Sequence, residues 1–246
     1  MNWKLFIFVG FAFAFVTILA LAQINTKISF ELITFPQFAP TLAYLFTILL
    51  FRDLHIPIKI NFNKTILAKS FIAILFPLAL FTIAYFIGTI IGIESKIQNN
   101  LFSIIIVSLF GIVIGAIAEE IGWRSFFQPR LEQKHSVFIS SIIVGLIWGI
   151  WHIGHYQNGL IFMLGFIVFT ISFSIIVVYL QKDTKNNLII PSLFHVSINI
   201  GGIIYFYDEA FIFVNIQLVL INSIVWLIAA IIITICGRRY YFVKAK

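Results

Sequence analysis

Two adjacent carboxylates and an arginine follow a long uncharged stretch of the sequence. Residues 101–115 carry no charge, and Glu119, Glu120 and Arg124 come shortly after them. Positions four apart share one face of a helix, so Glu120 and Arg124 can form an ion pair that makes burying both less costly. Glu119 is rotated by about 100° from Glu120 and can face elsewhere. We therefore expect one carboxylate to be structural and the other to be available for chemistry.

Two further apolar stretches carry the other candidate side chains. His152 ends the sequence WGIWH, while His195 and Asn199 lie four apart in HVSIN and project together from one helix face. Attack of water on a peptide carbonyl needs a base and donors for the developing oxyanion. Glu119 is a candidate base, and His195 and Asn199 are candidate donors. His152 is a candidate to orient the water or to bind a metal. The sequence lacks HExxH, which excludes the soluble zinc-protease helix as a template.

The elements that must position these residues are membrane helices. Of the 246 residues, 61% are hydrophobic and only 10% are charged, whereas soluble domains carry about 25% charged residues. A helix needs about 20 mostly apolar residues to cross the hydrocarbon core. We therefore predict an all-α, polytopic integral membrane bundle. Its eight predicted segments are residues 4–22, 37–51, 66–92, 101–127, 137–156, 159–180, 188–206 and 211–236.

The loops between these segments are short and predict one membrane-embedded domain over residues 1–246, with the polar motifs within residues 101–206. Most Lys and Arg residues fall in the even-numbered loops and at the two ends, whereas the odd-numbered loops hold only Lys27 and Lys96. By the positive-inside rule, both termini are cytoplasmic in a plasma-membrane protein. The first segment is expected to be retained because its apolar run exceeds the roughly 7–15 residues of a signal sequence. The scattered basic residues exclude a nucleic-acid-binding face.

The hairpin formed by the fourth and fifth segments brings candidate residues to one depth. If it turns near Lys134, Glu119 and His152 both lie roughly 20–25 Å from the turn at about 1.5 Å per residue. His195 and Asn199 lie about 12–18 Å from the cytoplasmic start of the seventh segment. We expect these four side chains to meet within the membrane, in a site that opens toward the cytoplasm.

The polar residues together resemble the signature of the CAAX protease and bacteriocin-processing family of intramembrane proteases, also called the Abi family. That family has the motifs EExxxR, an aromatic residue followed four later by His, and HxxxN or a close variant. This chain has EEIGWR, WGIWH and HVSIN, in that order. Its second motif departs mildly from the pattern, because Trp148 stands where Phe is usual. The motifs span residues 119–199, and the multi-helix frame agrees outside them.

The resemblance implies an intramembrane endopeptidase. Its substrate would be a membrane-associated or lipidated peptide or protein near the lipid bilayer, and glutamate-activated water would cleave it. Glu119 would activate the water, and Glu120 and Arg124 would support it. Eukaryotic members trim the last three residues after a prenylated cysteine. For a bacterial chain, the resemblance leaves peptide maturation, bacteriocin self-immunity or membrane-protein processing as roles.

The resemblance also implies roles for the remaining motif residues. His152 would be a second catalytic or ligand histidine, and His195 with Asn199 would bind the oxyanion or a ligand. A divalent metal such as zinc would be held by Glu119, His152, His195 and Asn199. Because three firm zinc ligands would require the carboxylate to ligate, its role as base would be less clear. A metal-free glutamate mechanism is therefore favoured.

Two other functions stay open from the sequence. A catalytically silent membrane scaffold or immunity protein would keep the same fold without the reaction. Buried Glu and His chains also carry protons or ions in transporters, but the internal repeats common in those folds are not visible in this sequence. The intact set of polar residues favours the protease over both.

Overall fold

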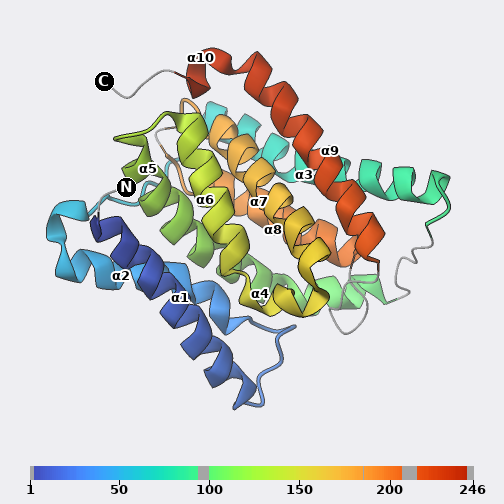
Figure 1. The fold of residues 1–246 in the computed structure, drawn as a ribbon, viewed down its shortest axis with the longest axis horizontal. Coiled ribbons are helices and arrows are strands. Elements are labelled where there is room, and N and C mark those ends of the chain that lie inside the picture. The colour runs from blue at the N-terminus through green and yellow to red at the C-terminus, as the bar shows by residue number, and fades with distance from the viewer. Residues whose placement is uncertain (1–2, 94–99, 185, 207–214, 243–246) are drawn as a thin grey trace.

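The computed structural model describes residues 3–93, 100–184, 186–206 and 215–242. Within those ranges the chain forms helices and no β-strand (Figure 1). The α-helices are α1 (Trp3–Ile24), α2 (Ala39–Leu50), α3 (Lys64–Ile90), α4 (Leu101–Glu120), α5 (Gln128–Glu132), α6 (Val137–Trp151), α7 (Leu160–Leu180), α8 (Ile189–Tyr205), α9 (Ile216–Cys236) and α10 (Arg238–Tyr241). Between them lie the short 3₁₀ helices η1 (Phe35–Phe38), η2 (Arg52–Leu54) and η4 (Ile153–Asn158), and the π-helical turn η3 (Ile121–Phe127).

The prediction of an all-α, polytopic membrane bundle is confirmed. In the described part of the chain, five helices are long and apolar enough to cross a membrane: α1, α3, α4 with its continuation to Glu132, α7 and α9. The other three predicted segments correspond to shorter apolar helices, namely Phe35–Leu50, α6 and α8. The predicted start of the last segment, residues 211–214, lies outside the described residues. The single domain over residues 1–246 stays a prediction.

Local sequence sets where several helices begin. The side chains of Asn63, Ser136 and Asn215 each accept a hydrogen bond from a backbone N–H in the first turn of α3, α6 and α9. Such caps satisfy N–H groups that have no partner inside the helix. Pro191 falls in the first turn of α8, where a missing N–H costs little.

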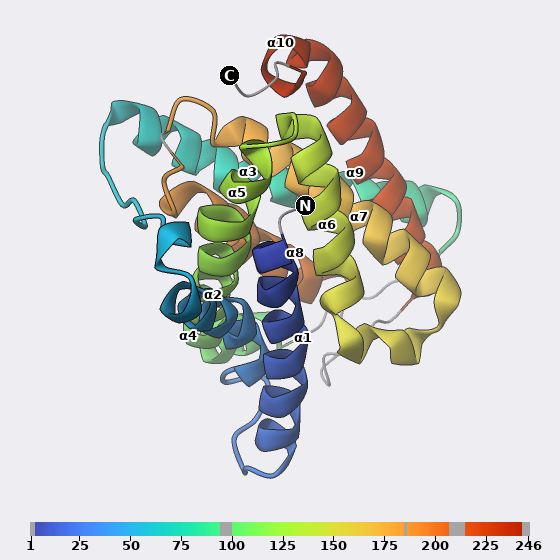
Figure 2. The same ribbon diagram turned by 60° about the vertical axis from the view of Figure 1, so that its left-hand side comes forward.

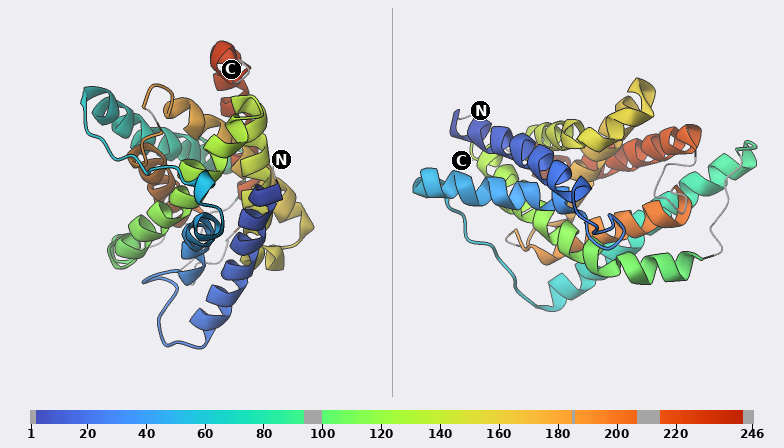
Figure 3. Two further views of the ribbon diagram at one scale, coloured as in Figure 1. Left: turned by 90° about the vertical axis from the view of Figure 1, so that its left-hand side faces the viewer. Right: turned by 90° about the horizontal axis from the view of Figure 1, so that it is seen from below.

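The central helix of the bundle is α7, which packs against α6 on one side and α9 on the other. Most of its apolar length is buried, whereas the other long helices expose most of theirs. Helix α3 packs on α8, and α1 lies beside α2 along one flank (Figure 2 and Figure 3). The exposed apolar side chains of the outer helices form a surface suited to lipid.

The loop after α2, the turn after α5 and the loop after α7 meet at one end of the bundle. Arg130 donates to the carbonyl oxygens of Asp53, Leu54 and His55 at 3.1–3.3 Å. Lys4 at the start of α1 donates to Asp53 at 2.6 Å and lowers the pKa of that carboxyl. Elsewhere at this end, the Leu188 N–H donates to the Lys59 carbonyl oxygen at 2.9 Å, and the Lys69 ammonium donates to the Lys182 carbonyl oxygen. We call this the basic end.

Helices α6 and α7 approach closely at Gly145. A Cβ at this position would lie 2.5 Å from Ile171 Cα and 2.7 Å from the Thr170 carbonyl oxygen, both backbone atoms of α7. Neither atom can move without shifting the helix. The small residue is therefore required by the packing of the central helix.

We predict that Gly145→Ala lowers the free energy of unfolding by about 1–3 kcal/mol, because the new methyl group overpacks the interface. Thermal unfolding in detergent, followed by tryptophan fluorescence, measures the change. Gly10→Ala in α1 is the matched control, since nothing lies within 4 Å of a Cβ there. Equal unfolding temperatures for the two variants would contradict this account of the contact.

Candidate active site

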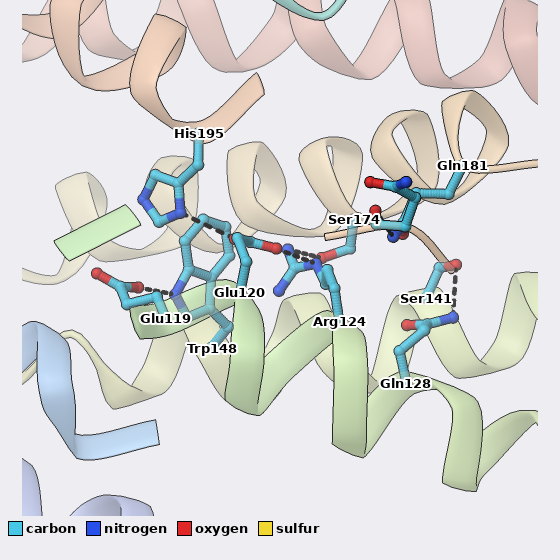
Figure 4. A network of polar contacts seen from close by, with 10 residues as sticks. Glu119, Glu120, Arg124, Gln128, Ser141, Trp148, Ser174, Gln181 and His195 are labelled. Atoms are coloured by element: carbon cyan, nitrogen blue, oxygen red, sulfur yellow. Dashed lines mark hydrogen bonds and ion pairs between the residues drawn. The ribbon is translucent and has the colours of Figure 1, made fainter. Parts of the chain in front are cut away.

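Glu120 is the buried centre of a polar network at the end of α4 (Figure 4). Its Oε1 lies 2.8 Å from His195 Nδ1, and its Oε2 lies 3.4 Å from Arg124 Nε. The predicted Glu120–Arg124 ion pair is therefore present. At 3.4 Å the contact is an ion pair rather than a directed hydrogen bond, and neither atom has another hydrogen-bond partner. One carboxylate thus holds α4, η3 and α8 together.

Arg124 is held by aromatic rings as well as by charge. Its Nη2 donates to Ser174 Oγ at 3.1 Å. The guanidinium carbon lies 4.8 Å from the ring centres of both Trp148 and Phe173. A guanidinium over an aromatic face is stabilised by the ring quadrupole, more strongly when water is excluded. These contacts join η3 to α6 and α7.

The turn that carries Arg124 is π-helical rather than α-helical. The Gln128 N–H bonds to the carbonyl of Trp123, five residues back, which widens the turn. On its outer side Gly122 packs against Pro40 of α2, where a Cβ would lie 2.5 Å from Pro40 atoms. Single π-helical turns inside α-helices occur frequently at functional sites. The sequence predicts one regular helix over residues 101–127, and this turn departs from that prediction.

Glu119, the neighbouring carboxylate, faces a different environment. Its side chain is 2% exposed, and Oε2 accepts a hydrogen bond from Trp148 Nε1 at 2.8 Å. Gln37 of η1 interacts with the same carboxylate from the opposite flank. Glu119 also lines a cavity, which Glu120 and Arg124 do not. The two carboxylates therefore face different surroundings, and the availability of Glu119 for chemistry stays a prediction.

His152 lies just beyond the end of α6. The sequence predicts a continuous helix over residues 137–156, but α6 ends at Trp151 and His152 has a non-helical ψ of 65°. Its Nδ1 lies 2.7 Å from the Trp148 carbonyl oxygen. A carbonyl only accepts, so Nδ1 is the donor and Nε2 is the acceptor nitrogen. His155 stacks on His152, with ring centroids 5.3 Å apart.

A cavity of about 780 Å³ brings together four of the six candidate residues, and we call it the active-site cavity. Glu119, His152, His195 and Asn199 all line it, together with Gln37. The expectation that these side chains meet inside the bundle is therefore met. A smaller cavity of about 100 Å³ adjoins it through His152, His195 and Asn199 and is lined largely by aromatic rings.

The active-site cavity lies at the end opposite the basic end. Its remaining lining comes from the second half of α1, from residues 30–37 and from residues 151–158. All of these segments lie away from the loops that carry most of the basic residues; Lys27, between α1 and residue 30, is the exception among the described residues. The expectation of a site opening on the side of the basic loops is therefore wrong. The depth estimate used distances along helices and did not include the loops that cover each end.

The predicted metal ligands do not form a compact set of acidic and histidine side chains. Among the described residues, no three His, Cys, Asp or Glu side chains are grouped closely enough to hold a metal ion. Zinc sites in enzymes use three protein ligands and one water. As arranged here, Glu119, His152 and His195 do not fit that pattern, and Asn199 is a weaker ligand. We therefore derive no step through a metal.

Three residues of the network were missed as contributors by the sequence analysis. Trp148 belongs to the second motif, but its sequence position alone did not indicate a hydrogen bond to Glu119. Gln37 begins the second predicted segment, and Ser174 lies within the sixth. Polar residues inside apolar segments were the available signal, since such residues usually find a partner in the bundle.

Comparison with known proteins gives two kinds of match. The sequence model of the family described as type II CAAX prenyl endopeptidase Rce1-like matches residues 99–201. Lysostaphin resistance protein A of Staphylococcus haemolyticus is 28% identical over 216 residues, which cover 85% of this chain and 59% of the relative. The protein of the same name from Staphylococcus aureus strain Newman is 26% identical over 230 residues, 90% of this chain and 55% of the relative. The chain thus spans less than two thirds of these relatives' length.

We predict that Glu120→Ala destabilises the fold by about 3–5 kcal/mol, because it leaves the Arg124 charge buried without its partner. Thermal unfolding in detergent measures the loss. The control is Asp53→Ala, which removes the ion pair with Lys4 at an exposed site and is expected to change stability little. Similar losses for both variants would show that the buried pair does not hold the helices.

Proposed function

The chain belongs to the CAAX protease and bacteriocin-processing family, and from that premise we propose that it is an intramembrane endopeptidase. The observation that carries the proposal is the environment of Glu119. This carboxylate is buried, is fixed by Trp148 at one oxygen, and lines a cavity together with His152, His195 and Asn199. Those are the groups that water-mediated cleavage of a peptide bond requires.

Glu119 acts as the base in this proposal. The Trp148 N–H occupies Oε2, so Oε1 is the oxygen that takes a proton from water. The resulting hydroxide attacks the peptide carbonyl carbon and forms a tetrahedral intermediate. Glu119 then passes the proton to the leaving amine as the C–N bond breaks. The base is thereby regenerated at the end of the cycle.

His152 positions the attacking water. Its Nδ1 donates to the Trp148 carbonyl, so its Nε2 can accept the second water proton. Trp148 therefore acts on both groups, since its indole fixes Glu119 and its carbonyl fixes the His152 ring. A water held between two such acceptors has one proton directed at the base.

His195 and Asn199 stabilise the oxyanion. Glu120 accepts from His195 Nδ1, which fixes the ring and stabilises its protonated form. The protonated ring offers Nε2–H to the developing charge, and the Asn199 amide offers a second donor from one helical turn later. Arg124 does not line the active-site cavity and acts by holding Glu120. Preorganised donors of this kind contribute about 3–4 kcal/mol each in known enzymes.

The surroundings of the site favour a substrate at the membrane. The bundle contacts the lipid bilayer through its outer helices, so a peptide segment at or near the membrane reaches the cavity most readily. The small adjoining cavity of about 100 Å³ has room for one apolar side chain of that segment. The plasma membrane, with both termini in the cytoplasm, is the proposed location.

A catalytically silent scaffold or immunity protein is the second candidate. The relatives from staphylococci carry the name of a resistance protein, which describes protection rather than cleavage. A scaffold needs the fold but not the chemistry of Glu119. It would therefore tolerate a near-isosteric change at that residue.

We predict that Glu119→Gln lowers cleavage by about 10²–10⁴-fold, because the amide cannot accept the water proton. The assay uses purified protein in detergent with a panel of fluorogenic and lipidated peptides, and a chelator arm tests for metal dependence. Tyr156→Phe, at an exposed residue of η4, is the control for activity lost during expression and purification. If wild type cuts no peptide, and wild type and Glu119→Gln protect cells equally in an immunity assay, the scaffold function replaces the protease function.

Trp148→Phe is predicted to lower kcat with little change in KM. The substitution keeps an aromatic ring beside Arg124 but removes the N–H that fixes Glu119. Steady-state kinetics on the best peptide of the panel separates the two constants. An unchanged kcat, or a loss confined to KM, would contradict the proposed role of this hydrogen bond.

A further inference from the structure

The basic residues mark one end of the bundle, independently of the active site. They lie at the start of α1, in the loops after α2 and α7, in the turn after α5, and in α10, where Tyr241 donates to the Ile175 carbonyl near the end of α7. Described basic side chains at or near this end are Lys4, Arg52, Lys59, Lys64, Lys69, Arg130, Lys134, Lys182, Arg238 and Arg239. Among the described residues, Lys27 is the one basic side chain at the opposite end.

The mouth of the active-site cavity is formed by the segments at that opposite end. Val16 and Ile24 lie in the second half of α1, which begins at the basic end. Gln23 ties the following loop down, because its side chain donates to the Ile33 carbonyl at 2.6 Å and accepts from the Phe35 N–H at 2.7 Å. Residues 153–158 of η4 complete the mouth. Figure 2 shows the second half of α1 and the segment after α6 on the side of the bundle away from α10.

We propose that the site takes its substrate from the extracytoplasmic side of the membrane. Loops rich in Lys and Arg stay in the cytoplasm, so the basic end faces inward and the cavity faces outward. The substrate is then a peptide segment of an exported or membrane-anchored polypeptide at the outer leaflet. The inference about the substrate rests on the proposed protease function. The inference about the side on which the cavity opens is independent of that function.

The lining of the cavity narrows the chemistry of that segment. Apart from Glu119 and the histidines it is uncharged, and it includes the polar side chains of Thr34, Gln37, Gln157 and Asn158. These groups suit hydrogen bonds to an extended peptide backbone. Of the described residues, no Lys or Arg lines the cavity, so the protonated His195 assigned to the oxyanion is the one cationic group there, and a substrate carboxylate would have no second cationic partner. The geometry therefore favours an uncharged internal segment over a C-terminal tripeptide with its free carboxylate.

Cysteine labelling tests the side of the cavity without any need for cleavage. In a Cys236→Ser background, which removes the one native cysteine, Gln157→Cys is placed at the mouth and Gln133→Cys at the basic end. Both glutamines are exposed; Gln157 lies in η4 and Gln133 directly follows α5. We expect a membrane-impermeant maleimide to label Gln157→Cys in intact spheroplasts and Gln133→Cys only after permeabilisation. The reverse pattern overturns the proposal. Glu31→Cys, at an exposed residue next to Phe30 of the cavity lining, serves if Gln157→Cys folds poorly.

Cleavage from each side tests the substrate. A fluorogenic peptide coupled to dextran, which cannot cross the membrane, is added to intact spheroplasts or to inverted vesicles. We expect wild type, but not Glu119→Gln, to cut it in spheroplasts, and to cut an amidated peptide at least tenfold faster than one with a carboxylate next to the scissile bond. Cutting only in inverted vesicles overturns the outward-facing substrate and leaves the protease standing. If the peptide is cut in neither preparation and detergent-solubilised protein does not cut it either, the protease function is overturned. The labelling result still gives the side on which the cavity opens.

Discussion

The buried carboxylate of Glu120 is the interaction on which the site depends. A charge in the interior of a membrane protein is stable only when it is paired, and Glu120 is paired with Arg124 on one oxygen and with His195 on the other. Those two contacts join α4, the π-helical turn and α8. Arg124 extends the connection to α6 and α7 through Trp148, Phe173 and Ser174. The network therefore fixes the relative positions of the helices that carry the chemistry.

This arrangement gives two neighbouring glutamates different tasks. Glu120 is enclosed by the network, whereas Glu119 lines the active-site cavity and accepts from Trp148 at Oε2. The π-helical turn that follows carries both Arg124, which pairs with Glu120, and Gly122, which packs closely against Pro40 of α2. Trp148 connects the two tasks, because its ring covers Arg124 and its N–H holds Glu119. Removing the aromatic group would therefore affect charge burial and base geometry together.

Much of the fold and part of the site follow from local sequence. Apolar segments predict membrane helices because the bilayer requires every backbone polar group to bond within its own helix. The spacing of Glu120 and Arg124 predicts their ion pair because i and i+4 side chains share one face of an α-helix. Gln37 and Ser174 could not be assigned in this way. Their partners lie in other helices, and their contacts depend on how those helices cross.

The sequence by itself determined that this chain enters a membrane, which segments form helices, and which polar side chains are too costly to bury without a purpose. Those properties depend on residue type and on spacing along one helix. Only the tertiary structure decided that α6 ends before His152, that Trp148 is the donor to Glu119, and that the cavity opens away from the basic end. These features depend on which loops fold over each end of the bundle. Loop packing joins residues far apart in the chain, so no local pattern encodes it.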